Sequence, residues 1–157
     1  MNKNLTIASV QMFVHKEKKK NLEEIKNHLD YLSKVFPQVK MVVFPELCAS
    51  DINKEVKEQA EKIPGELTEF FSHLAKRHEL WLIPGSMYEQ SGKKIYNTTT
   101  IFSPKGELVG KYRKRYPWCP YEKTDPGKDP FVFHIEGVGV VGVMICYDLW
   151  FPEVARD

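Results

Sequence analysis

Apolar residues in the first half of the chain are spaced in a way that predicts alternating strands and helices. Residues 5–12 form a mostly apolar first strand. Apolar positions at three- and four-residue spacing then predict an amphipathic helix over residues 22–35, which Pro37 ends. The remaining elements are a short apolar strand, a helix and another strand, at residues 41–44, 67–74 and 80–84. This order favours an α/β layered fold.

From residue 95 onward the pattern changes to short strands joined by tight turns. Residues 96–102 and 107–112 flank the turn signal Pro-Lys-Gly and predict a hairpin. Residues 113–127 combine aromatic, proline and charged residues, which is typical of a structured loop. A strand resumes at residues 131–135, and Gly137 turns the chain into the next one.

The stretch from Val138 to Pro152 has the clearest local pattern in the chain. The apolar and glycine run Val138–Ile145 predicts a strand buried on both faces, and Pro152 suits the first position of a helix. Cys146 would therefore stand at the carboxyl end of a strand and close to a helix amino terminus, where the helix dipole favours a thiolate. Free cysteines are also among the most buried residues, so this stretch alone leaves a structural role open.

The whole chain has the length and composition of one globular domain, residues 1–157, with 42% hydrophobic and 28% charged residues. Its net charge of +2 gives no general attraction to nucleic acid. No apolar run approaches membrane-spanning length, and the amino terminus lacks the core of a signal peptide. The three cysteines, Cys48, Cys119 and Cys146, have no short paired spacing, which favours free thiols in a reducing, cytoplasmic setting.

Charged residues at strand ends supply candidate chemistry. Glu46 directly follows a buried strand, where a carboxylate is costly unless it is paired or used. Hydrolysis of an amide needs a nucleophile, a base, positive charge for the developing oxyanion and an acid for the departing amine. Cys146, Glu46 and Lys114 supply that set, although each taken singly fits an ordinary buried thiol or solvated charge equally well.

Three motifs in order give the chain a family resemblance. They are Pro45-Glu46, then Gly-Lys-Tyr-Arg-Lys ending at Lys114, then Cys-Tyr-Asp-Leu-Trp-Phe-Pro-Glu beginning at Cys146. The chain resembles the nitrilase superfamily of carbon–nitrogen hydrolases, over its whole length. The resemblance implies part of a four-layer αββα sandwich.

The resemblance also implies roles for individual residues. Cys146 would be the nucleophile that forms a thioester, Glu46 the general base, and Lys114 the group that stabilises the tetrahedral intermediate with the backbone N–H of Tyr147. Glu122 matches a second glutamate that orients the lysine and the substrate. Further substrate contacts are expected from the loop and from the turn after the nucleophile, at Trp118 and Trp150.

The implied reaction is hydrolysis of a small primary amide or an N-carbamoyl compound. Nitriles rank below these two classes as expected substrates. The resemblance implies no cofactor. A metal site is not expected either, because the five histidines include no i,i+4 pair and none stands beside a cysteine. The glycines of residues 137–142 lie within a strand, so they do not indicate a dinucleotide loop.

Members of this superfamily are longer than this chain, which ends at Asp157, soon after the nucleophile motif. We therefore expect an exposed sheet face that self-association or a partner chain covers. Two alternatives stay open. One is a catalytically incomplete fragment or non-enzymatic scaffold of the same fold. The other is a thiol redox protein in which Cys48 or Cys119 resolves Cys146.

Overall fold

The computed structural model describes residues 4–157 and gives a mixed α/β fold, as the sequence predicts. The helices are α1 (Lys18–Val35), α2 (Val56–Gln59), α3 (Glu66–His78) and α4 (Pro152–Arg156), with a 3₁₀ helix η1 at Cys146–Trp150. The strands are β1 (Ile7–Ser9), β2 (Met41–Val43), β3 (Trp81–Ile83), β4 (Ser86–Ser91), β5 (Lys94–Phe102), β6 (Leu108–Arg113), β7 (Val132–Ile135) and β8 (Gly139–Gly142). None of the described helices combines the length and apolarity needed to cross a membrane.

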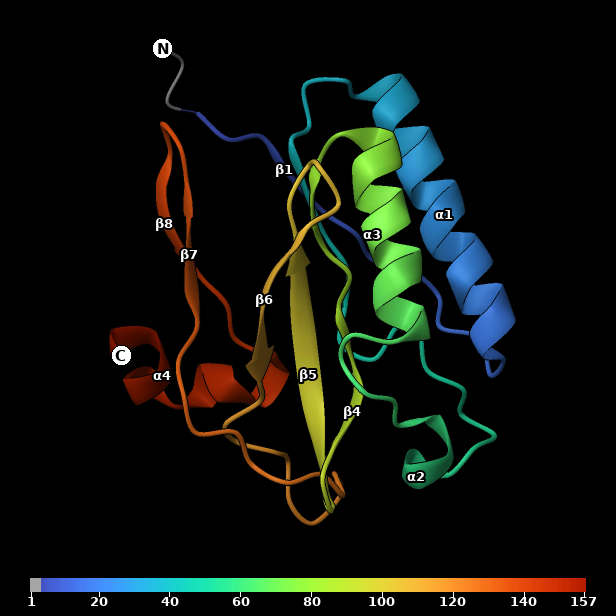
Figure 1. Ribbon diagram of the computed structural model, residues 1–157, viewed down its shortest axis with the longest axis vertical. Coiled ribbons are helices and arrows are strands. Elements are labelled where there is room, and N and C mark those ends of the chain that lie inside the picture. Colours follow the sequence, from blue (N-terminus) through green and yellow to red (C-terminus); the bar gives the residue numbers. More distant parts are fainter. Residues whose placement is uncertain (1–3) are drawn as a thin grey trace.

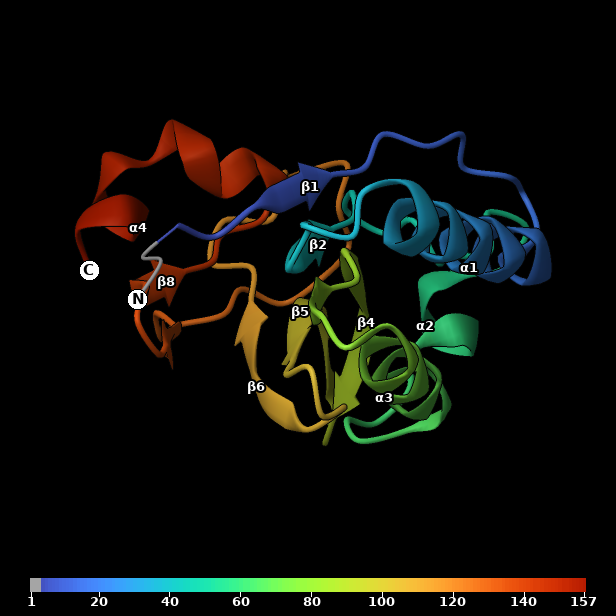
Figure 2. The same cartoon turned by 90° about the horizontal axis from the view of Figure 1, so that it is seen from above.

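The larger sheet has the strand order β1-β2-β3-β5-β4, and β6 pairs with β5 as well. The pairs β1–β2 and β2–β3 are parallel, whereas β5 is antiparallel to β3, β4 and β6. Strands β7 and β8 form a separate antiparallel hairpin. Viewed from above, α1, α2 and α3 lie on one side of the larger sheet, and the hairpin and α4 lie on the other (Figure 2).

Two apolar clusters hold these layers together. The larger cluster lies between the helices and the sheet and includes Ile25, Leu29, Val42, Phe71 and Phe102. A smaller one lies between the sheet and the β7–β8 hairpin, and its buried members are Met41, Ile83, Ile101, Phe133 and Ile135. Strands β2 and β3 contribute to both clusters, so the short apolar runs that predict them are buried on both faces.

Most of the predicted elements are confirmed. Helix α1 ends two residues before Pro37, and α3 covers the apolar positions of residues 67–74. The hairpins β5–β6 and β7–β8 form where the turn signals predict them, and residues 114–131 form the structured loop between them. The first strand is shorter than predicted, and α2 and β4 were not predicted.

The prediction of a long strand over residues 138–145, buried on both faces, is wrong. Strand β8 covers only Gly139–Gly142, and its side chains alternate between a packed and an exposed face. Val141 packs on the smaller cluster, whereas Val140 is 69% exposed, and the hairpin stands at the edge of the molecule (Figure 1). The chain also forms η1 before it enters α4, where Pro152 takes the predicted N1 position.

Candidate active site

One cavity of about 660 Å³ brings together every residue that the sequence predicts for the site. Glu46 follows β2, Lys114 follows β6, and Cys146 begins η1, so three separate elements supply the reactive groups. The lining consists of Glu46, Leu47, Tyr88, Lys114, Trp118, Tyr121, Glu122, Cys146, Tyr147 and Trp150.

Lys114 lies at the centre of the polar groups, and its side chain is only 2% exposed. Its Nζ donates to Oε1 of Glu46 at 2.7 Å and to Oε2 of Glu122 at 2.6 Å. Burial disfavours the ammonium, but the hydrogen bonds to Glu122 and Glu46 outweigh this effect and raise the pKa of Lys114. An ammonium has three N–H donors, so one remains after both carboxylates are served.

Asn97 joins the same two carboxylates from β5. Its Nδ2 donates to Oε1 of Glu46 and to Oε1 of Glu122, both at 2.8 Å, and the residue is fully buried. Lys114 and Asn97 therefore bridge the two glutamates side by side. This arrangement holds two like charges in one site with a cation and a neutral donor between them.

The two glutamates differ in how many donors they face. Glu122 also accepts from the backbone N–H of Trp118 at 3.1 Å and from Oγ1 of Thr124 at 3.0 Å, so both of its oxygens are occupied. Burial raises its pKa, but the hydrogen bonds from Lys114, Asn97 and Trp118 outweigh burial and lower it. The described hydrogen bonds to Glu46 both end on Oε1, which leaves Oε2 for a proton from another group.

The loop that carries Glu46 is fixed by a close approach to the β3–β4 connection. Gly85 has a φ of +75°, and a Cβ there would lie 2.0 Å from the carbonyl oxygen of Pro45. The next residue, Ser86, accepts the backbone N–H of Leu47 at 3.1 Å through its hydroxyl. Only glycine fits this position, because any side chain would push the Glu46 loop away from the sheet.

Cys146 has a φ of +46°, in the left-handed region that a side chain with Cβ rarely adopts. It is exposed on the cavity side. Burial by neighbouring atoms and, after it, the Glu46 carboxylate raise the pKa of the Cys146 thiol, against a smaller lowering effect of Lys114. The thiol pKa therefore moves away from the thiolate that the nearby helix amino terminus would favour, because burial and the Glu46 carboxylate act in the opposite direction.

Aromatic side chains form the mouth of the cavity. The ring of Trp118 lies 4.8 Å from that of Tyr121 and 6.4 Å from that of Tyr147, and Trp150 continues the row at 6.2 Å from Tyr147. Trp118 and Trp150 are 53% and 79% exposed. The cavity thus has a charged floor and an aromatic rim, so an apolar substituent can pack at the rim while a polar group reaches the floor.

The other two cysteines differ from Cys146. Burial raises the pKa of the Cys48 thiol to about 12, and Cys119 is exposed in the loop without lining the cavity. Within residues 4–157, no group of three or more histidine, cysteine, aspartate or glutamate side chains has a geometry that would hold a metal ion.

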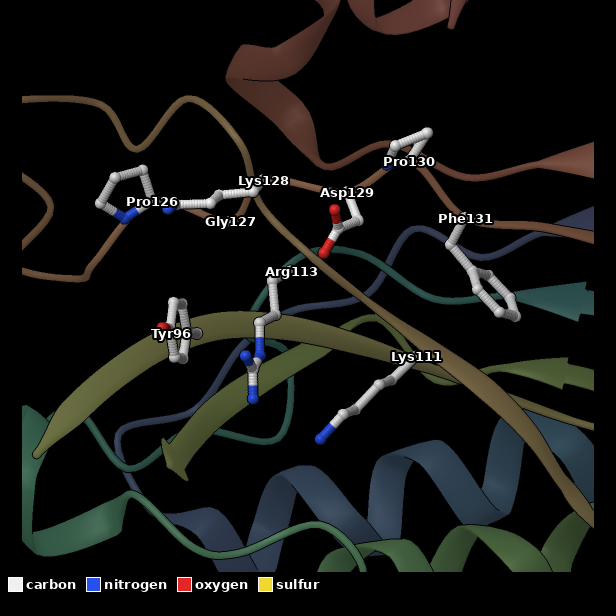
Figure 3. A pocket seen from close by; sticks show the side chains of 9 residues that line it. All are labelled: Tyr96, Lys111, Arg113, Pro126, Gly127, Lys128, Asp129, Pro130 and Phe131. Atoms are coloured by element: carbon white, nitrogen blue, oxygen red, sulfur yellow. The ribbon is translucent and has the colours of Figure 1, made fainter. Parts of the chain in front are cut away.

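A second cavity of about 330 Å³ lies beside strands β5 and β6, under residues 126–131 (Figure 3). Lys111 and Arg113 project from β6 to the same side, and the Arg113 guanidinium lies 4.0 Å from the centre of the Tyr96 ring. Both cations donate to Glu89 on β4, which is 2% exposed and also accepts from Thr98. These basic groups are therefore already engaged by a buried carboxylate.

Comparison with known proteins identifies the family. The family model for carbon–nitrogen hydrolases matches residues 6–157, so the chain belongs to that family. It is 35% identical over 161 residues to the omega-amidase NIT2 of Danio rerio, covering 96% of this chain and 57% of that protein. It is 34% identical over 128 residues to a formamidase of Bacillus thuringiensis, covering 78% of this chain and 38% of that protein.

Solved structures agree with the sequence relatives. The crystal structure of Saccharomyces cerevisiae Nit3, a member of the nitrilase superfamily, matches with a TM-score of 0.84 and 31% identity, over 96% of this chain and 58% of that chain. An amidase from Nesterenkonia sp. has the same fold, with a TM-score of 0.82 at 20% identity over 99% of this chain and 60% of that one. The predicted nitrilase-type fold is confirmed, and the chain spans less than two thirds of the length of these relatives.

Some residues of the cavity were not predicted from the sequence. Leu47, Tyr88 and Tyr121 line it, and Asn97, which does not line it, holds its two glutamates. Tyr88 belongs to β4, whose polar sequence gives no strand signal. Only Asn97 had a signal: an amide side chain at the centre of an otherwise apolar and threonine-rich strand is costly unless it is hydrogen-bonded.

Proposed function

We propose that this chain carries the active site of an amidase that hydrolyses small primary amides or N-carbamoyl compounds and releases ammonia. The observation that carries the proposal is the pairing of Lys114 with two unequal glutamates beside an exposed cysteine. The named activities of the omega-amidase and formamidase relatives support the same reaction class.

In the proposed mechanism, Oε2 of Glu46 takes the proton of the Cys146 thiol while the sulfur attacks the carbonyl carbon of the substrate. Burial and Glu46 raise the pKa of this thiol, which favours its protonated form, so the attack needs such a base. The remaining N–H of Lys114 and the backbone N–H of Tyr147 stabilise the oxyanion of the tetrahedral intermediate.

Collapse of the intermediate breaks the carbon–nitrogen bond. Glu46 returns its proton to the departing nitrogen, ammonia leaves, and the acyl group stays on Cys146 as a thioester. Glu46 then takes a proton from water as the water oxygen attacks the thioester. The second tetrahedral intermediate breaks its carbon–sulfur bond, Glu46 returns the proton to the Cys146 sulfur, and the acid leaves. Glu122 has both oxygens occupied, so it orients Lys114 and the substrate and does not act as the base.

The rim supports the assignment of Trp118, Tyr147 and Trp150 to substrate binding. Their rings offer apolar surface beside the thiol, which suits the acyl substituent of a small amide. Neutral amide and carbamoyl groups fit the charged floor because they present both a carbonyl acceptor and an N–H donor.

The test is release of ammonia from a panel of primary amides, carbamoyl compounds and nitriles. Cys146→Ala is compared with Cys119→Ala, which removes an exposed thiol that does not line the cavity. We expect Cys119→Ala to retain activity and Cys146→Ala to lose it. Release that survives in Cys146→Ala, or release from nitriles and never from amides, would overturn the proposed reaction. A folded wild-type chain that releases nothing would favour the alternative of a non-enzymatic scaffold.

We also propose that residues 1–157 behave as one domain in a reducing, cytoplasmic setting, and that a second copy or a partner chain covers the outer face of the β7–β8 hairpin. The exposed side chains of Val132 and Val140 support this. A monomer by light scattering that melts cooperatively would count against the covered face.

A further inference from the structure

Asp148 is a fully buried carboxylate next to the candidate site that does not line the cavity. It lies in η1, two residues after Cys146. Its Oδ1 accepts the backbone N–H groups of Arg115 at 3.2 Å and Tyr116 at 2.9 Å. Its Oδ2 accepts the hydroxyl of Tyr112 at 2.8 Å and the backbone N–H of Ile145 at 3.0 Å.

These four donors come from two segments that are distant in the sequence. Tyr112, Arg115 and Tyr116 flank Lys114 at the end of β6, whereas Ile145 immediately precedes Cys146. The Asp148 carboxylate therefore ties the segment that carries Lys114 to the turn that carries Cys146. Each of the two oxygens accepts at least one hydrogen bond from the Lys114 segment.

The turn has a second feature that needs such a restraint. The positive φ of Cys146 is a conformation that a non-glycine residue keeps only when its surroundings hold it. The backbone N–H of Ile145 donates to the side chain of Asp148, and this hydrogen bond closes the turn that contains Cys146.

We infer that Asp148 is a positioning residue, which sets the separation and orientation of Cys146 and Lys114 without contacting the substrate. The inference rests on the proposed function, in which these two groups act on the same carbonyl. A carboxylate is required because three of the four donors are backbone N–H groups that cannot become acceptors. An asparagine amide has one acceptor oxygen, so either orientation of it leaves one set of donors facing an NH₂ group.

The test is Asp148→Asn, which keeps the size of the side chain. We expect kcat for amide hydrolysis to fall about 100-fold, the scale reported for an ångström of misplacement, with KM within about threefold of wild type. Ile25→Val is the matched control, since it removes a methylene group from the larger cluster, away from the site. If Ile25→Val loses about as much thermal stability as Asp148→Asn, it should still keep the wild-type kcat.

A second readout requires no turnover. The pH dependence of Cys146 alkylation by iodoacetamide, followed by mass spectrometry of the Cys146 peptide, reports the thiol pKa. Lys114 lowers that pKa, so a displaced Lys114 should move the Asp148→Asn profile to higher pH. This readout also works if the wild-type chain releases no ammonia, so it separates failure of this inference from failure of the proposed function.

Wild-type kcat and an unchanged alkylation profile in folded Asp148→Asn would overturn the inference. If Asp148→Asn does not fold, Tyr112→Phe decides, because it removes one of the four donors and leaves the three backbone bonds. A reduced kcat or an upward shift of the alkylation profile in Tyr112→Phe would support the positioning role, and wild-type values for both would overturn it.

Discussion

Replacing Glu89 with glutamine tests whether the buried ion cluster beside β6 holds the strand that leads to Lys114. Glu89 is 2% exposed and accepts a two-pronged contact from Arg113, at 2.8 and 2.7 Å, together with hydrogen bonds from Lys111 and Thr98. Burial raises its pKa, but the hydrogen bonds from Arg113, Lys111 and Thr98 outweigh burial and lower it from 4.5 to about 2.

That difference gives the expected magnitude. At 1.36 kcal/mol per pKa unit, it corresponds to about 3 kcal/mol of stability at neutral pH. The value agrees with the roughly 3–5 kcal/mol lost when one partner of a buried ion pair is removed. Because the folded-state pKa is the lower one, this contribution is present above pH 4.5 and is lost as the pH falls from 4.5 towards 2.

The assay is urea unfolding followed by tryptophan fluorescence, from pH 7 down to pH 3. We expect Glu89→Gln to be less stable than wild type by about 3 kcal/mol at pH 7, with the difference falling to roughly half of that value by pH 3. Glu136→Gln is the control, since Glu136 is exposed in the β7–β8 turn. A difference below about 1 kcal/mol at pH 7, or one equally large at pH 3, would refute the reasoning.

Three further substitutions test the polar groups of the candidate site. Lys114→Met should lower the free energy of unfolding by about 3–5 kcal/mol at pH 7, because it leaves two carboxylates facing each other. Without the lysine the pKa of Glu122 rises, so thermal unfolding should show part of the lost stability recovered at pH 5. Glu46→Gln should abolish ammonia release and move Cys146 alkylation to lower pH, since it removes a group that raises the thiol pKa; an unchanged alkylation profile would contradict this. Asn97→Asp puts a third carboxylate between Glu46 and Glu122, so the acidic limb of the pH–rate profile should shift to higher pH. A wild-type profile would show that the Asn97 bridge is unimportant.

The sequence predicts those parts of the fold that local pattern determines. Apolar spacing gives α1 and α3, and turn residues give both hairpins, because each signal lies within a few neighbouring residues. Strand β4 was missed because its Glu89 and Gln90 are polar, and Glu89 is buried only through cations on β6 that the strand's own sequence does not reveal.

The candidate site shows the same division. The order of Glu46, Lys114 and Cys146 in three motifs was sufficient to place them in one hypothesis, and they do line one cavity. The direction of the Cys146 pKa was not accessible, because it depends on burial in the folded chain and on a carboxylate 100 positions earlier in the sequence. The bridging contacts of Asn97 and the unequal hydrogen bonding of the two glutamates likewise require the folded arrangement.

The charged lining of the larger cavity has a consequence for what enters and leaves it. Its charged residues are Glu46, Glu122 and Lys114, so the described floor carries one excess negative charge. A neutral amide approaches this floor without electrostatic cost, whereas the carboxylate that the proposed hydrolysis would produce is repelled. If the proposed reaction takes place, the site would therefore favour the exit of the acid, and the acid should be only a weak competitive inhibitor at concentrations at which the amide already fills the site.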